Sequence, residues 1–304
     1  MLLLLTLFPL ALIGAAIAIA DDDDDTPQQS DDQQVEGTSA DDVITTATGD
    51  DIVTGGPGDD TLDGAQGSDI IIGDGGLDQI RGGDGNDLLL GRGGGDVVEG
   101  NAGDDWVEGD GGDDTVTGGR GADTVIGSEG ADLIIGGNDD DVLIDGVVPG
   151  TPLDTATLEL LRGGTSLLDI VGTDPLSLTD DLDADTLNGN DGADVLIFGK
   201  GDIASGEGGV DDFAMVTDGA ASALDTARIL DFEPTTETFA LIVPADTAVM
   251  PTVTVQTQGL DAIVSVDGAE LATIVGAAGQ IDAADISIFT GVAPTLLDPK
   301  PPTA

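Results

Sequence analysis

The sequences GGPGDDTLD at residues 55–63 and GGDGNDLLL at residues 82–90 show the nine-residue pattern that decides the fold. Twelve units of this pattern follow one another without a break from residue 37 to residue 144. The first position is Gly in every unit except at Thr46, and the fourth is Gly in all but the two terminal units. So long a run in constant phase indicates a structural repeat rather than a low-complexity segment.

Two further positions keep one chemical character in all the units. The eighth position is always a branched aliphatic residue: Ile44, Val53, Leu62, Ile71, Ile80, Leu89, Val98, Val107, Val116, Val125, Ile134 and Leu143. The sixth position is always aspartate: Asp42, Asp51, Asp60, Asp69, Asp78, Asp87, Asp96, Asp105, Asp114, Asp123, Asp132 and Asp141. The eighth position therefore supplies one inward anchor per unit.

The unit divides into a turn of six residues and a strand of three. Gly at positions one and four tolerates a positive φ, so the turn can be tight and can direct its carbonyl oxygens inward. A helical interpretation fails because a period of nine gives no constant helical face and the glycines would destabilise each helix. The pattern predicts an all-β protein, a parallel β-roll or β-solenoid of about six coils with two units per coil, roughly 29 Å long.

These units resemble the RTX (repeats-in-toxin) haemolysin-type calcium-binding nonapeptide repeat. In that family, the turns of successive coils hold a calcium ion between them through position-six carboxylates and turn carbonyls. The resemblance implies that the twelve aspartates at position six are calcium ligands, together with main-chain oxygens of the glycine-rich turns. It covers residues 37–144 most closely.

The chemistry of the column supports the same ion independently. Calcium takes six to eight oxygen ligands in flexible geometry, which carboxylates and glycine carbonyls can provide. Aspartates stacked about 5 Å apart repel one another unless a cation lies between them. Sites that join each unit to the next unit but one give up to about ten calcium ions in this first array. We therefore expect the array to be largely disordered without calcium and to fold on binding it.

Composition narrows the function further. The chain of 304 residues has 7 Lys plus Arg against 61 Asp plus Glu, a formal net charge of -54, so nucleic acid is not a partner. It has no His and no Cys, which excludes Ser-His pairs and imidazole bases, and aromatic residues that could stack on sugars are almost missing. We predict that the protein is not an enzyme.

The N-terminal region has two compositions. Residues 1–20 are apolar apart from Thr6 and predict a membrane-targeting segment, either an anchor or a signal peptide cleaved after Ala18-Ile19-Ala20. No Lys or Arg precedes the apolar run, so the usual orientation signal is missing. Residues 21–36 are acidic and Gln-rich, which is typical of a disordered tether.

After residue 144 the phase breaks and then returns in poorer form. Residues 145–179 contain three prolines and form an insert that either caps the roll or is a plain loop. Residues 180–214 form a degenerate second array, in which the stretch between Phe198 and Ser205 is one residue short and lacks the aspartate. One or two further calcium ions are expected there. The aspartates in the expected column are Asp185, Asp194 and Asp211. Whether this array stacks on the first or forms its own roll is left open.

The C-terminal region loses its glycines. Residues 215–295 alternate like strands, with Asp267-Gly268 as a tight-turn signal, and predict a small antiparallel β cap. The pair Asp231-Phe232 is similar to the end of many RTX regions. Residues 296–304, with three prolines, predict a loose tail.

Positions seven and nine should face outward from the roll, in two opposite sheets. One outer face is mostly polar. The other is apolar: Ile52, Ile70, Ile72, Leu88, Leu90, Trp106, Ile126, Val142 and Ile144. So large an apolar face needs a cover, which is either the insert, the C-terminal domain, or a partner that includes a second copy of the chain.

These features predict a secreted or cell-surface calcium-binding RTX-type protein with a structural, adhesive or matrix role at the bacterial surface. Its β-roll would fold on meeting extracellular calcium at 10⁻⁴ to 10⁻³ M. The alternatives are a secreted RTX-associated hydrolase or an accessory domain of one, and a calcium buffer or sensor with submicromolar sites.

Overall fold

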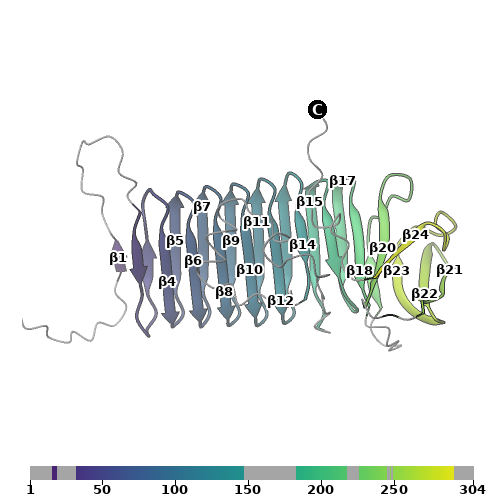
Figure 1. Ribbon diagram of the computed structural model, residues 1–304, viewed down its shortest axis with the longest axis horizontal. Coiled ribbons are helices and arrows are strands. Elements are labelled where there is room, and N and C mark those ends of the chain that lie inside the picture. The colour runs from purple at the N-terminus through teal and green to yellow at the C-terminus, as the bar shows by residue number, and fades with distance from the viewer. Residues whose placement is uncertain are drawn as a thin grey trace, which may run out of the picture.

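The computed structural model describes residues 32–146, 183–217, 226–244, 247 and 249–290, and the backbone of one short strand at residues 16–18. Within these residues the protein is all β, a parallel β-solenoid of about eight turns that runs along the long axis of the molecule (Figure 1). The predicted fold class is confirmed.

Two sheets form the walls of the solenoid. One has 13 strands in the order β1-β3-β5-β7-β9-β11-β13-β15-β17-β19-β23-β22-β21, and we call it sheet A. The other has 11 strands in the order β2-β4-β6-β8-β10-β12-β14-β16-β18-β20-β24, and we call it sheet B.

The strands of sheet A are β1 (Ala16–Ala18), β3 (Val43–Thr45), β5 (Thr61–Gln66), β7 (Gln79–Asp84), β9 (Val97–Ala102), β11 (Thr115–Arg120), β13 (Leu133–Asn138), β15 (Thr186–Gly192), β17 (Ile203–Gly209), β19 (Ala227–Ile229), β21 (Val253–Gln258), β22 (Asp261–Val266) and β23 (Ala269–Ile274). Those of sheet B are β2 (Gln34–Glu36), β4 (Ile52–Pro57), β6 (Ile70–Gly75), β8 (Leu88–Gly93), β10 (Trp106–Gly111), β12 (Thr124–Glu129), β14 (Val142–Ile144), β16 (Val195–Phe198), β18 (Asp212–Val216), β20 (Thr238–Val243) and β24 (Ile286–Thr290).

Each coil of the first array contains two nonapeptides. In sheet B, Ile71 of β6 pairs with Val53 of β4 and with Leu89 of β8, so neighbours in the ladder are two units apart. Every position-eight residue faces the interior and is at most 1% exposed. The predicted inward anchor is therefore confirmed, and these residues form one continuous core along the roll.

The strands are longer than the three residues predicted, because pairing resumes after the first position of the next unit. In β4 and β6, Gly56 pairs with Asp74 and Pro57 with Gly75. The positive φ lies at position two, as at Gly56 (φ 98°) and Asp74 (φ 77°), and at position four. The prediction that position-one glycines adopt a positive φ is wrong. These glycines are needed because the site next to them has no room for a side chain.

The second array stacks directly on the first, which answers the question left open by the sequence. β15 pairs in parallel with β13, and β16 pairs with β14. The partners Asp141 and Asp194 are 53 residues apart instead of the usual 18, and the second array nevertheless continues the ladder in register. Of the predicted insert 145–179, residues 147–179 lie outside the described part of the chain.

The C-terminal region only partly matches the predicted antiparallel cap. β21, β22 and β23 are antiparallel, and Asp267 and Gly268 join β22 to β23 with positive φ at both residues, as a two-residue hairpin turn requires. β19, β20 and β24, however, continue the parallel ladders beyond the second array. The edge-to-face contact of Phe213 with Phe232, whose ring centroids are 5.8 Å apart, closes the core at this end.

The two outer faces differ as predicted. On sheet A, Val43 and Val97 are 48% and 41% exposed, whereas on sheet B, Leu88 and Leu90 are 2% and 0% exposed. A cluster on sheet B reaches the C-terminal end, where Phe289 of β24 packs against it. Because these apolar residues are buried, we do not propose this face as a surface for self-association. The predicted cover by the insert falls on residues outside the described part.

The predicted terminal segments are only partly described. Residues 34–36 of the predicted disordered tether instead form β2, in which Val35 pairs with Val53 of β4, and residues 21–31 of it lie outside the described part. Three residues of the predicted membrane-targeting segment form β1, which pairs with β3 in parallel. The remainder of residues 1–20 and the predicted tail 296–304 lie outside the described residues. Among the residues described, no helix has the length and apolar character needed to cross a membrane.

Candidate metal centre

The position-six aspartates lie at the ends of the turns, one residue before each strand. All twelve are buried, from 0% exposed at Asp51 and Asp69 to 4% at Asp132. A buried carboxylate is unfavourable unless hydrogen bonds or a counter-ion compensate it. The structure therefore has to provide partners for two long columns of negative charge, one beside each sheet.

One oxygen of each carboxylate is bonded to the protein. Asp60 Oδ1 accepts the backbone N–H of Asp42 at 2.7 Å, and Asp78 Oδ1 accepts that of Asp60 at 2.8 Å. The same bond recurs along both columns, always with a donor one coil earlier in the roll. Each aspartate thus ties its own coil to the preceding one.

In ten aspartates of these columns the second oxygen has no such partner among the described residues. Among the residues that the structure describes, no hydrogen-bond donor reaches the buried Oδ2 atoms of Asp51, Asp60, Asp78, Asp96, Asp105, Asp114, Asp123, Asp141, Asp194 and Asp211. Buried polar atoms in native proteins nearly always have a partner. A column of identical atoms without one indicates a missing binding partner.

The surroundings of this oxygen contain further acceptors. A Cβ atom placed on Gly73 would lie 2.3 Å from Asp78 Oδ2 and 2.8 Å from the carbonyl oxygen of Gly91 in the next coil. A carboxylate oxygen and a carbonyl oxygen therefore lie close together beside Gly73, and the same pair recurs beside other position-one glycines, including Gly64, Gly91 and Gly100. Oxygen acceptors without a proton donor are what a hard cation such as calcium requires. The residues present fit the ion that the resemblance implies.

This arrangement predicts that Gly73→Ala is poorly tolerated. The new methyl group would occupy the space between the two oxygens, and we expect a loss of about 1–3 kcal/mol in stability together with a higher calcium midpoint. Gly75→Ala in the same turn is the matched control, because a Cβ there would meet nothing closer than 3.8 Å. Thermal unfolding and calcium titration of both variants check this, and equal losses would contradict it.

The first turn is closed by the protein itself. Asp42 Oδ2 accepts the N–H of Thr38 at 2.6 Å and its hydroxyl at 2.9 Å. In the following unit the hydroxyl of Thr46, the single exception to glycine at position one, donates to the Gly64 carbonyl at 2.8 Å. At the N-terminal end of the roll, threonine hydroxyls therefore donate to oxygens of the kind that lie beside the position-one glycines in later coils.

Burial also changes the acidity of the column. Desolvation is the largest effect and raises the pKa of Asp78 to about 6, of Asp105 to about 7, of Asp123 to about 8 and of Asp141 to about 9. The backbone hydrogen bond lowers each pKa but does not offset the desolvation. At neutral pH these carboxylates therefore need either a proton or a cation.

A second ladder of side-chain bonds runs along the outer rim at position five. Asp59 Oδ1 accepts the N–H of Leu77, and Asn86 Oδ1 accepts that of Asp104, both from one coil later. These bonds point in the opposite direction to those of position six. Sequence reasoning missed them, although the recurrence of Asp or Asn at position five is a visible signal.

The predicted residues of the second array lie in the same columns. Asp185, Asp194 and Asp211 are buried, and the Oδ1 atom of each accepts a backbone N–H from one coil earlier. Asp202 was missed. It occupies position six of an eight-residue unit, where its Oδ1 accepts the N–H of Asp185 at 3.1 Å. The loss of one turn residue, between Phe198 and Asp202, hid it from a search at fixed spacing.

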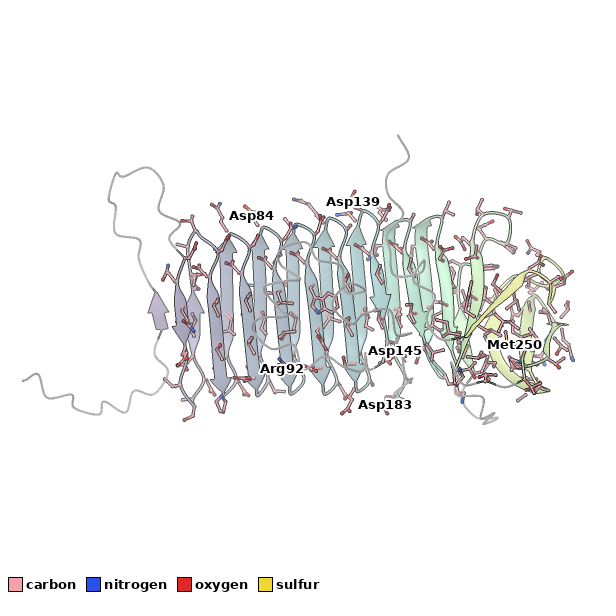
Figure 2. All side chains as sticks on the ribbon, in the orientation of Figure 1. Asp84, Arg92, Asp139, Asp145, Asp183 and Met250 are labelled. Carbon is pink, nitrogen blue, oxygen red and sulfur yellow. The ribbon has the colours of Figure 1, made fainter. Side chains whose placement is uncertain are left out.

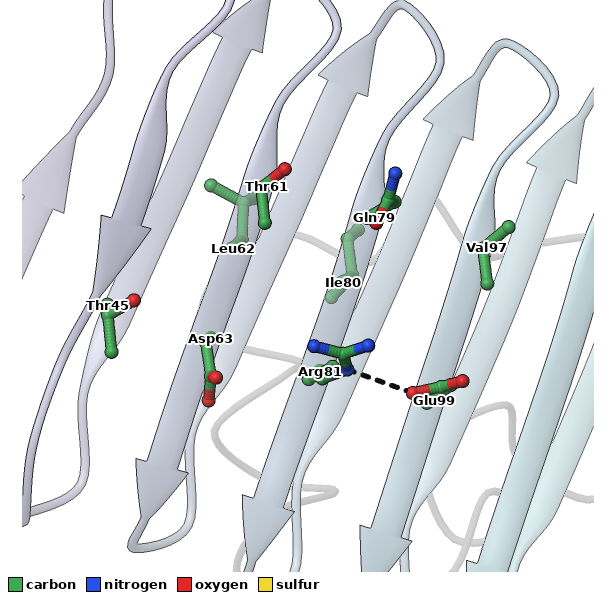
Figure 3. Close-up of a pocket in the computed structure, with 9 residues that line it drawn as sticks. All are labelled: Thr45, Thr61, Leu62, Asp63, Gln79, Ile80, Arg81, Val97 and Glu99. Carbon is green, nitrogen blue, oxygen red and sulfur yellow. Dashed lines mark hydrogen bonds and ion pairs between the residues drawn. The ribbon is translucent and has the colours of Figure 1, made fainter. Parts of the chain in front are cut away.

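Sheet A also carries a shallow polar groove on its outer face (Figure 3). Arg81 and Glu99 form an ion pair of 3.0 Å across it, with Thr45, Thr61 and Asp63 beside them. The two charged side chains are 56% and 40% exposed, so their pairing contributes little to stability. The cavity of about 60 Å³ is too small for more than a few water molecules.

Comparison with known families agrees with this geometry. The family described as the RTX calcium-binding nonapeptide repeat (4 copies) matches residues 36–71, 63–98, 90–125, 117–144 and 177–202. A search of curated proteins finds no match to the chain. Residues 36–144 and 177–202 of this protein are thus an array of RTX calcium-binding nonapeptide repeats.

Proposed function

We propose that this calcium-binding protein is exported and that its roll folds when it meets extracellular calcium. The observation that carries the proposal is the pair of columns of buried carboxylates, in which ten aspartates have an oxygen that lacks a donor among the described residues. At several of them, as beside Gly55, Gly73 and Gly91, a carbonyl oxygen of the next coil lies close to the carboxylate oxygen. Charge neutralisation by calcium would convert a self-repelling stack into a stable one.

The net charge of -54 supports a location outside the cell. A chain with so much negative charge resists collapse at the low calcium concentrations of a cytosol, which suits passage through a narrow channel. Calcium at 10⁻⁴ to 10⁻³ M, the range of extracellular modules, would then fold it. The role of residues 1–20 as a membrane-targeting segment, an anchor or a cleaved signal, is part of this proposal.

The ion numbers belong to the proposal as well. Up to about ten calcium ions in the first array, and one or two in the second, follow from sites that each join two successive coils. The position-six residues would hold them through Oδ2: Asp42, Asp51, Asp60, Asp69, Asp78, Asp87, Asp96, Asp105, Asp114, Asp123, Asp132, Asp141, Asp185, Asp194 and Asp211. Asp42 is the weakest member of this set, because Thr38 already donates to its Oδ2.

We further propose a structural, adhesive or matrix role without catalysis. The described side chains that face the outside of sheet A are mostly hydroxyl, amide and carboxylate groups, as in the groove of Figure 3. The chain has no histidine and no cysteine to act as a general base or nucleophile. A stiff rod of parallel coils suits a spacer or a matrix component.

A calcium titration of the full chain tests the proposal. Far-UV circular dichroism from zero to 10 mM calcium should show a cooperative gain of β signal, with a midpoint between 10⁻⁴ and 10⁻³ M. Magnesium is the control and should have little effect, because it resists the loss of its water shell. A midpoint below 10⁻⁶ M would indicate a cytosolic buffer or sensor instead, and a full β signal in calcium-free buffer would contradict coupled folding.

A further inference from the structure

The junction between the two arrays contains an acidic residue at a position that the repeat reserves for glycine. β14 ends at Ile144, and the backbone N–H of Asp145 donates to Ile197 O at 2.8 Å. Gly37 makes the equivalent bond to Thr54 O at 2.7 Å at the start of the first unit. Asp145 is therefore a position-one residue, although the described chain stops one residue later and resumes at Asp183 (Figure 2).

A side chain at position one points towards the carboxylate of its own turn. A Cβ atom on Gly136, for example, would lie 2.4 Å from Asp141 Oδ2. At the junction the corresponding position-six residue is Asp185, and the next coil contributes Asp202. One carboxylate oxygen from each of Asp145, Asp185 and Asp202 lies within 4.8 Å of the others.

All three carboxylates are buried, with exposed fractions of 4%, 1% and 0%. Asp202 is fixed by the backbone, because its Oδ1 accepts the N–H of Asp185 at 3.1 Å and its Oδ2 accepts that of Gly199 at 2.5 Å. Asp145 differs from it, since neither of its buried oxygens has a hydrogen-bond donor among the described residues. A wholly buried carboxylate directed at two others requires a positively charged partner.

We propose that Asp145 joins Asp185 and Asp202 in binding one calcium ion at the junction, so that this site contains a third carboxylate that the repeat itself does not supply. Carboxylate oxygens are the ligands that a hard cation such as calcium takes. Lys200, which is 5% exposed and two residues from Asp202, can offset at most one of the three charges.

The site would link the chain segments on either side of residues 147–182. Gly146 and Asp183 are the last and first described residues on either side of residues 147–182, and they adjoin Asp145 and Asp185. In a repeat turn, six consecutive residues join one strand to the next. Here the turn residues come from two segments that are far apart in the sequence, and an ion held by the three side chains would tie the end of β14 to the start of β15.

A shared proton is the competing way to relieve the charge. Burial, followed by the neighbouring Asp185 and Asp202, raises the pKa of Asp145 well above its usual range. A protonated Asp145 could donate to either neighbour. The substitution Asp145→Asn separates the two explanations, because the amide reproduces the donor of a protonated carboxyl but removes a negatively charged ligand.

Native mass spectrometry of the full chain, which resolves single bound calcium ions, provides the measurement. At saturating calcium we expect Asp145→Asn and Asp202→Asn each to bind one ion fewer than the unmodified chain. Asp84→Asn, an exposed turn residue with the same change in charge, should bind the full number. Asp145→Gly, which restores the residue of the repeat and avoids any packing problem, should also bind one ion fewer.

The calcium midpoint measured by circular dichroism shows whether a variant has lost only the junction site or has also affected the other calcium sites. For Asp145→Asn the calcium midpoint should stay within about twofold of that of the unmodified chain, since the other calcium sites of the roll are unchanged. An unchanged ion count in Asp145→Asn and Asp145→Gly would overturn the junction site and favour the shared proton. A chain that binds no calcium at all would instead overturn the proposed function of the repeats, so the two failures are distinguishable.

Discussion

Replacing Asp78, Asp96 and Asp114 together by Asn should remove three calcium ions and make the roll less dependent on calcium. These residues follow one another in one column, and the Oδ1 of each of the last two accepts the N–H of the one before. Asparagine keeps that acceptor. The amide nitrogen of asparagine replaces Oδ2 and can donate to the nearby carbonyl oxygen of the next coil.

The expected result has two parts. Calcium at ten times the dissociation constant stabilises the chain by about 1.4 kcal/mol per site, so the variant should lose about 4 kcal/mol of calcium-induced stabilisation. In calcium-free buffer a larger fraction of the variant than of the unmodified chain should be folded, because three buried charges are gone and three donors are added. Chemical unfolding in calcium measures the first quantity, and far-UV circular dichroism in calcium-free buffer measures the second.

The triple variant Asp59→Asn, Asp104→Asn and Asp113→Asn is the matched control. It changes the net charge equally, but these exposed position-five residues only accept backbone N–H groups on the outer rim. Asn86 already fills the same role in the natural sequence. If both triple variants changed the calcium response equally, the effect would come from overall charge and the ligand assignment would be wrong.

In calcium-free buffer the roll should be more stable at pH 5 than at pH 8. An aspartate in the unfolded chain has a pKa of about 3.9, whereas burial raises the pKa of Asp114 to about 7 and of Asp123 to about 8. Between these values the folded chain binds more protons than the unfolded one. The free energy of unfolding therefore falls as pH rises from about 4 through the folded pKa values.

Calcium should reverse this dependence, because protons compete with the ion for the same oxygens. The calcium midpoint should therefore be lower at pH 8 than at pH 6. Circular dichroism at both pH values, with chelating resin used to prepare the calcium-free samples, gives the two trends. Stability in calcium-free buffer that rises from pH 5 to pH 8 would contradict the burial of these carboxylates, and the position-six triple variant should show a weaker pH dependence.

The fold was predictable because the repeat has one phase and two invariant columns. The position-eight aliphatics fixed the core and the parallel stacking, and the position-six aspartates lie where the resemblance implies. Periodicity does not reveal which property of glycine a position uses. Gly73 is required for space and Gly56 adopts a positive φ, and only the path of the backbone separates the two.

Other features depend on contacts that no local pattern encodes. The alignment of β15 on β13 across residues 147–182 is set by the match of Leu187 to Ile134 in the core. The strand β2 forms because Val35 completes the same core beside Val53, although its neighbours are typical of a disordered chain. Asp145 looked like an ordinary loop residue, since its two acidic neighbours come from segments 40 and 57 residues further along the sequence.

The opposed directions of the two carboxylate ladders give the roll a polarity. At any cut between coils, the N-terminal piece would keep bare position-six amides and unfilled position-five carboxylates, while the C-terminal piece would keep the reverse. The two cut faces are therefore complementary rather than identical, because the donors of one face match the acceptors of the other. A coil that has lost its successor exposes inner donors and outer acceptors, and one that has lost its predecessor exposes inner acceptors and outer donors. Growth from the two ends is therefore chemically unequal.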